Sequence, residues 1–186
     1  MSVNARFAEQ PQALTFVVAG QEYAIGILNV KEIIEYESPT RVPSAPPCVA
    51  GVINLRGTVV PVIDLALRFN LAPTAVTSRT CIVVVEVDLD GQTTVMGVLA
   101  DAVSAVIDLA ADQIDEPPQF GTRVRSDYLL GMIRSGRKFI LLLDIDRTLA
   151  AIDAATIDAS NESIAGVAEL AAVSQTNERR TQERSQ

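Results

Sequence analysis

The stretch INLRGTVVPVIDL, residues 53–65, reverses the chain between two strongly apolar runs. Both runs are rich in β-branched residues, which favours a strand on each side of the turn. The turn itself consists of Asn54, Leu55, Arg56 and Gly57. Glycine tolerates the positive φ that such hairpin turns need. A reversal alone requires neither the leucine nor the arginine at the tip, so Arg56 needs another explanation.

Short apolar runs separated by turn signals continue along most of the chain. The predicted strands are residues 14–19, 22–27, 32–36, 49–55, 58–63, 81–87, 93–100, 102–107, 128–133 and 138–143. Many short strands at this spacing are typical of β barrels or sandwiches rather than of βαβ units. We therefore expect a mainly β protein.

An internal repeat relates two of the predicted hairpins. GVINLRGTVVPVID (51–64) and GMIRSGRKFILLLD (131–144) have the same length, and each has a glycine-containing turn near its centre. In each, the final aspartate follows a strand and precedes a segment that can be helical. Asp64 and Asp144 are therefore predicted to cap short helices by accepting bonds from unpaired helix amides.

A weaker repeat links residues 24–34 with residues 95–107, if a two-residue insertion is allowed. Two similar β units of about five strands each explain both repeats. We expect the first unit at about 14–76 and the second at about 79–150, and the repeats leave exchange of strands between them open. The flanking regions are predicted to be a flexible tail at 1–13 and a helical or disordered extension at 151–186.

Composition narrows the class of protein. The chain has 186 residues, is 48% hydrophobic and carries a net charge of −8, which argues against nucleic acid as a partner. Cys48 and Cys81 lie in apolar runs and are predicted to be small buried side chains, with a disulfide left open. Residues 1–12 contain no apolar stretch of signal-peptide length, and no segment approaches the roughly 20 apolar residues of a membrane span. We expect a soluble, cytosolic protein without membrane insertion.

Several kinds of chemistry are missing from the sequence. The chain contains no histidine, which removes most zinc sites and the usual serine or cysteine nucleophile arrangements. It also contains no glycine-rich phosphate loop and no dinucleotide fingerprint. We therefore predict no catalytic residue, no metal and no cofactor. A carboxylate-dependent enzyme that uses Asp64 or Asp144 stays open as the alternative.

Two pairs of apolar residues suggest a binding surface. Val30 and Ile33 are three residues apart, as are Val103 and Val106 in the corresponding segment of the repeat. All four residues fit a core position equally well. If the two units meet at these segments, however, they would form an apolar groove that suits a partner helix.

Arg56 has two interpretations as well. It could be a solvated turn residue paired with Glu32, Glu35 or Glu37, which contributes little to stability. Alternatively, its guanidinium is a fork of five donors for the carbonyls or carboxylates of a partner.

These motifs together resemble the CheW family of bacterial chemotaxis adaptors. The resemblance covers about residues 14–150 and rests on GVINLRGTVVPVIDL, FVVAGQEYAIGILNVKEII, MGVLADAVSAVIDLAADQI and YLLGMIRSGRKFILLLDIDRTL. It implies two intertwined SH3-like five-stranded β barrels with short helices. The implied activity is non-catalytic coupling of methyl-accepting chemoreceptors to the histidine kinase CheA. Such a protein is cytoplasmic and is recruited to membrane-associated receptor arrays. An adaptor of another chemosensory pathway, for pili or gliding, has the same fold.

The resemblance also implies partners and site residues. The partners are the cytoplasmic receptor tip, the CheW-like regulatory domain of the kinase and further CheW copies in array rings. The residues that match receptor-facing positions are Val30, Glu32, Ile33, Arg56, Val103 and Val106. The kinase-side candidates are Phe120 and Asp115, although some family members have a basic residue in place of Asp115. Without the resemblance, Phe120 could equally cover the second barrel.

Overall fold

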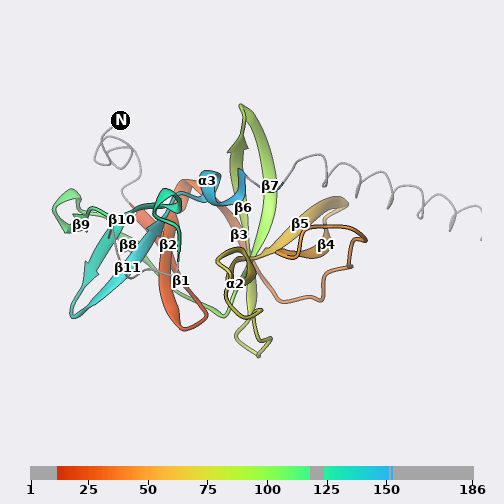
Figure 1. Cartoon of the computed structure of the whole chain (residues 1–186), viewed down its shortest axis with the longest axis horizontal. Coiled ribbons are helices and arrows are strands. Elements are labelled where there is room, and N and C mark those ends of the chain that lie inside the picture. Colours follow the sequence, from red (N-terminus) through yellow and green to blue (C-terminus); the bar gives the residue numbers. More distant parts are fainter. Residues whose placement is uncertain (1–11, 118–123, 151, 153–186) are drawn as a thin grey trace, which may run out of the picture. The chain divides into compact units, whose positions relative to one another are not determined.

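The computed structural model describes residues 12–117, 124–150 and 152, and its strands form two sheets (Figure 1). The six-stranded sheet has the order β8 (Ala102–Asp108), β1 (Gln12–Val18), β2 (Gln21–Gly26), β11 (Lys138–Leu143), β10 (Leu129–Ser135), β9 (Ile114–Asp115). The five-stranded sheet has the order β3 (Val30–Glu35), β6 (Cys81–Leu89), β7 (Gln92–Ala100), β5 (Thr58–Asp64), β4 (Val49–Leu55). The predicted mainly β fold is confirmed.

The helical elements of the described residues are short, and all but the last connect strands. They are η1 (Ile27–Asn29), α2 (Leu65–Arg68), η2 (Ala111–Gln113), η3 (Ser126–Tyr128) and α3 (Ile145–Ala150). The chain divides into two units, Met1–Ala151 and Ile152–Gln186, and every element named here belongs to the first. The predicted C-terminal extension lies almost wholly outside the described residues. At the other end, β1 already begins at Gln12, within the segment that was expected to be a tail.

The two units expected from the sequence exchange strands: β1 and β2 join the sheet that contains β8 to β11, and β6 and β7 join the sheet that contains β3 to β5. The first two strands of the chain join the six-stranded sheet, where β2 pairs in parallel with β11 through Tyr23 and Leu141. The chain then builds the whole five-stranded sheet, from β3 to β7, before it returns to the six-stranded sheet with β8. Residues 71–78, at the expected boundary between the two units, therefore lie between β5 and β6 of one sheet.

The strand orders of the two sheets match. Each has one parallel pair, β2 with β11 and β5 with β7. In each, a hairpin continues the sheet on one side of that pair, β10–β11 or β4–β5, and a second hairpin lies on the other side. Beyond the second hairpin, β8 and β3 form the corresponding edges. The repeat seen in the sequence is thus a repeat of topology.

Each sheet curls around its own apolar core. The core of the five-stranded sheet consists of Ile53, Val60, Val62, Ile82, Val84 and Leu99. Ile34 of edge strand β3 and Ala50 of edge strand β4 both pack against it, so the two edges of the sheet approach the same core. In the six-stranded sheet, Ile107 of β8 and Ile114 of β9 do the same.

The outer faces of the central strands are buried too. Val83 and Val85 point away from the five-stranded core and have no exposed surface, so β6 is apolar on both faces. Helix α3 packs against β6, and β1 of the six-stranded sheet contacts β7. Four of the eight aromatic side chains, Phe16, Tyr23, Phe69 and Tyr128, form a row with centroid separations of 6.2, 5.4 and 6.5 Å.

Candidate functional site

The four apolar candidates of the sequence lie on the edge strands β3 and β8. Ile33 and Val106 expose 46% and 50% of their surface, whereas Val30 and Val103 are half-buried. Their neighbours across the ladder are buried: Ile33 pairs with Val83, and Val106 pairs with Leu14. The interpretation of all four as core residues is therefore wrong for Ile33 and Val106. Both lie where a buried apolar layer reaches the surface.

A contact at Cys81 brings the two edge strands together. Cys81 opens β6 and pairs with Glu35, the last residue of β3. The backbone of Val103, in β8, is hydrogen-bonded to the Cys81 thiol. Burial raises the pKa of this thiol, and the Val103 bond opposes that rise. Through Cys81, the end of β3 thus lies near the start of β8.

One exposed apolar residue beside this edge was missed from the sequence. Leu28 lies in η1, directly before β3, and exposes 67% of its surface. Nearby, the Asn29 side chain donates to the Glu86 carbonyl at 3.2 Å, which fixes η1 against β6. The segment ILN has neither strand nor helix periodicity, and this is the only sequence signal that could have drawn attention to Leu28.

The turn at Asn54–Gly57 is a two-residue hairpin in which both central residues have positive φ. The angles are 51° at Arg56 and 85° at Gly57, which is the pattern of a type I′ turn. Asn54 Oδ1 accepts a bond from the Gly57 amide at 2.7 Å. Leu55 packs against the five-stranded core, so the leucine beside the tip closes the end of the barrel. Arg56 alone has no role in forming the turn.

Arg56 extends from the turn to β3 and pairs with Glu32. Its Nη1 and Nη2 donate to the two carboxylate oxygens at 2.9 and 2.7 Å. The Arg56 side chain is 77% exposed and that of Glu32 is 26% exposed. Glu32 and Ile34 pair with Val84 and Ile82, both core residues, so Glu32 lies on the core side of β3. The pair therefore sits at the mouth of the five-stranded barrel.

Of the two kinase-side candidates, only Asp115 lies within the described residues. Asp115 lies in β9, and both its oxygens accept bonds from Arg134 at 2.7 Å. These bonds hold the pKa of the Asp115 carboxyl below its ordinary value of 3.8. Asp115 therefore ties β9 to β10. Phe120 lies outside the described residues.

Asp64 and Asp144 act as helix caps. Asp64 Oδ1 accepts from the amides of Ala66 and Leu67 at 2.9 and 3.4 Å. Both of its oxygens also accept bonds from Thr74. Asp144 Oδ1 accepts from the Arg147 amide at 3.1 Å. The capping role predicted from the sequence is confirmed, and it occupies the carboxylates that the enzyme hypothesis would need.

Among residues 12–117, 124–150 and 152, no group of three or more acidic or cysteine side chains could hold a metal ion. Within the same residues, no helix is long and apolar enough to cross a membrane.

Known proteins resemble this chain over most of its length. The model of the CheW-like domain matches residues 12–153. The chemotaxis protein CheW of Klebsiella aerogenes is 36% identical over 145 residues, which are 78% of this chain and 85% of that protein. The CheW protein of Bacillus subtilis is 34% identical over 79% of this chain and 92% of its own length.

A solved structure agrees with these sequence matches. The scaffolding protein TtCheW from Thermoanaerobacter tengcongensis superposes with a TM-score of 0.67 at 29% identity, over 75% of this chain and 88% of that one. Fold, repeat and relatives thus agree on a chemotaxis scaffold rather than an enzyme. The chain belongs to the CheW family.

Proposed function

We propose that this chain couples methyl-accepting chemoreceptors to the histidine kinase CheA, in the cytoplasm, at membrane-associated arrays. Its membership of the CheW family supports this proposal. The observation that carries it is the exposure of Ile33 on edge strand β3 and of Val106 on edge strand β8, each beside buried neighbours. Large exposed apolar side chains at a sheet edge are typical of binding surfaces for other proteins.

The receptor tip would bind along this edge. Val30, Ile33, Val103 and Val106 supply apolar contacts for one face of a helix, and we add Leu28 to them. A helix bound here would remove these apolar side chains from water. This burial stabilises the complex by about 25 cal/mol for each Å² of apolar surface covered.

Arg56 and Glu32 would form the polar end of the same surface. Their pair is exposed, and pairs of this kind contribute only about 0–1 kcal/mol to stability. The guanidinium can therefore leave Glu32 for an acceptor on the receptor at little cost. A charged hydrogen bond to a partner contributes roughly 1.5–3 kcal/mol.

The kinase would bind at a separate surface on the six-stranded sheet. We keep Phe120 and Asp115 as the candidates for this contact, with the CheW-like regulatory domain of CheA or a further copy of this chain as the partner. Asp115 is already paired with Arg134, so a partner at β9 would meet a neutralised pair rather than a free carboxylate. Phe120 would then supply the apolar part of the contact.

Val106→Glu tests the receptor surface. We expect it to lower affinity for the receptor tip at least tenfold, because a carboxylate there would be buried against an apolar helix without a partner. The melting temperature should change little, because Val106 is half exposed. Affinity for the isolated kinase regulatory domain should stay within about twofold. Calorimetric titration of both partners with the same preparation measures all three quantities.

Val76→Glu is the matched control, because Val76 is 54% exposed but belongs to the segment between α2 and β6. It makes the same change of charge and should leave receptor binding intact. Equal receptor affinity of both variants would contradict the proposed receptor surface. A large fall in the melting temperature of Val106→Glu, but not of Val76→Glu, would instead mean that Val106 serves the core.

A further inference from the structure

A small hollow lies between α2 and η3, and none of the proposed receptor-binding residues lines it. It has a volume of about 260 Å³, and its walls include Cys48, Arg68, Phe69, Arg125 and Tyr128. Arg68 ends the helix that follows β5 of the five-stranded sheet, while Tyr128 ends η3, which precedes β10 of the six-stranded sheet. The hollow is therefore walled by segments that are far apart in the sequence and attached to different sheets.

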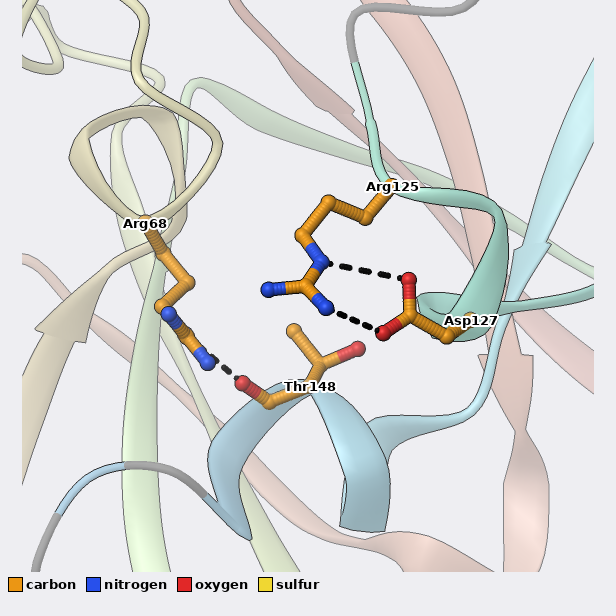
Figure 2. A network of polar contacts seen from close by, with 4 residues as sticks. All are labelled: Arg68, Arg125, Asp127 and Thr148. Carbon is orange, nitrogen blue, oxygen red and sulfur yellow. Dashed lines mark hydrogen bonds and ion pairs between the residues drawn. The ribbon is translucent and has the colours of Figure 1, made fainter.

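Arg68 is held at one side of this hollow. Its Nε donates to the Thr148 carbonyl at 2.8 Å (Figure 2), and its Cζ lies 4.9 Å from the centre of the Tyr128 ring. Its Nη2 is buried and, within the described part of the chain, has no hydrogen-bond partner. Buried donors are almost always paired, because an unpaired one has lost its hydrogen bonds to water without replacing them. A missing acceptor is therefore expected at this place.

Arg125 provides a second guanidinium. Its Cζ lies 5.3 Å from the centre of the same Tyr128 ring. Asp127 accepts bonds from its Nε and Nη2 at 3.2 and 2.7 Å. Figure 2 shows that Asp127 occupies one side of this guanidinium, while the other side is turned toward Arg68. Two like charges are thus placed around one ring, and a single carboxylate neutralises one of them.

We propose that this hollow binds a carboxylate between Arg68 and Arg125. A planar carboxylate matches the fork of a guanidinium and would supply the acceptor that Nη2 lacks. It would also neutralise the one positive charge of the two guanidiniums that Asp127 does not balance. A doubly charged phosphate suits the place less well, because it would leave a net negative charge beside the Thr148 carbonyl.

The other polar group of the wall does not compete for this role. Burial raises the pKa of the Cys48 thiol, and the charge of Arg68 opposes that rise. The thiol therefore stays protonated near neutral pH and supplies no negative charge. Because the protein is a scaffold, the natural source of the carboxylate is an aspartate or glutamate side chain of a protein partner.

Titration of the full-length, ¹⁵N-labelled chain with sodium acetate tests the site, with sodium chloride holding the ionic strength constant. We expect saturable shifts of the Arg68 and Arg125 Nε–Hε signals and of the Tyr128 ring. Arg125→Gln should weaken acetate binding at least tenfold. Arg137→Gln, which removes an exposed arginine from the β10–β11 turn, should leave it unchanged. Arg125 is used in preference to Arg68, because loss of the Thr148 bond could unfold the chain.

Asp127→Asn gives a test in the opposite direction. It removes the carboxylate that competes for Arg125, so acetate should bind more tightly than to the wild type. Shifts that are linear in acetate, a full response in Arg125→Gln, or tighter binding of inorganic phosphate than of acetate would each overturn the proposal. Weaker binding of Arg125→Gln to receptor tip or kinase domain would assign the carboxylate to a protein partner. Unchanged binding to both would assign it to a free carboxylic acid.

Discussion

The hairpins Gly51–Asp64 and Gly131–Asp144 differ far more at their tips than at their ends. Both begin with a glycine at a β-bulge, Gly51 in β4 and Gly131 in β10. Both end with an aspartate whose amide donates 2.8 Å to the residue three before that glycine, Cys48 or Tyr128. Conformation and contacts are thus repeated at the ends, where the sheets need them.

The tips have no such similarity. In the first hairpin the turn is Arg56-Gly57 with both φ angles positive, whereas in the second it is Gly136-Arg137, and only Gly136 has positive φ. The hairpin between β6 and β7 shows what the first turn needs. There Asp88 Oδ1 accepts from the Gly91 amide at 2.7 Å, as Asn54 does from Gly57, and Asp90 takes the place of Arg56 with φ 54°.

Asp and Asn adopt positive φ more readily than Arg does. An arginine at this position is therefore an unfavourable choice for folding, and its side chain must serve another purpose. The repeated ends and the different tips separate the residues that build the fold from the residue proposed to bind the receptor.

Gly51→Ala is expected to have the largest effect on stability. A Cβ there would lie 2.3 Å from the Thr40 carbonyl oxygen, on a backbone with φ 147°. The clash breaks the two bonds between Thr40 and Val52, 2.8 and 2.9 Å, and should cost about 3 kcal/mol or more. At Gly131 the nearest atoms are 2.8 Å away and φ is not positive, so Gly131→Ala should cost less. Urea unfolding measures both.

Gly136→Ala separates strain from space in the same experiment. Nothing lies within 4 Å of a Cβ at this glycine, but its φ is 60°. Its cost should be only about 1 kcal/mol, from backbone strain alone. If Gly131→Ala proved as costly as Gly51→Ala, the two bulges would be equivalent and the first would not be the tighter one.

The sequence predicts local structure well because most strands are bounded by strong turn signals. The predicted run 138–143 coincides with β11, and the segment after Asp144 coincides with α3. The missed strand β9 has two residues, Ile114 and Asp115, which is too short for any periodicity. The exchange of strands depends on the parallel pairs β2–β11 and β5–β7, whose partners are distant in the chain, so no local pattern indicates which strands pair.

The candidate site shows the same limit. Ile33 and Val106 could be named from the repeat, but their exposure depends on both strands being sheet edges. The hollow beside Arg68 was not predicted, because Thr148, whose carbonyl accepts the hydrogen bond from Arg68, is 80 residues further along the chain. Side chains that meet only through the packing of two sheets leave no pattern in one sequence.

Arg56→Asn is expected to have almost no effect on stability and a clear effect on binding. Asparagine tolerates the φ of 51°, which offsets the loss of an exposed ion pair with Glu32. The urea midpoint should therefore stay within the equivalent of about 1 kcal/mol. Receptor affinity should fall about tenfold, because a charged hydrogen bond of roughly 1.5 kcal/mol is lost. Arg56→Lys should recover part of it, since an ammonium keeps the charge but not the fork.

Asp90→Asn is the control, because it makes the same residue at the matching place of the β6–β7 turn. It should leave both stability and receptor affinity unchanged. Equal receptor affinity of Arg56→Asn and wild type would mean that the two tips do not differ in function.

The smallest expected effect is on stability at low pH. It arises beside the two bulge glycines, where the second hairpin has a charged neighbour, Asp115, and the first has Thr40. Thr40 bridges to Val52 in the first half, and Asp115 pairs with Met132 in the matching place of the second. Arg134 holds the pKa of Asp115 below 3.8, so the folded state binds that proton less readily than the unfolded state. The resulting stabilisation is present above about pH 4 and is lost as the pH falls through the lowered pKa. Between pH 6 and pH 3, the urea midpoint of Arg134→Gln should fall slightly less than that of wild type. The control is Arg137→Gln, because Arg137 has no carboxylate partner among the described ion pairs. Its urea midpoint should fall as much as that of wild type. Parallel pH profiles of wild type and Arg134→Gln would mean that this ion pair is as strong in the unfolded chain as in the folded one.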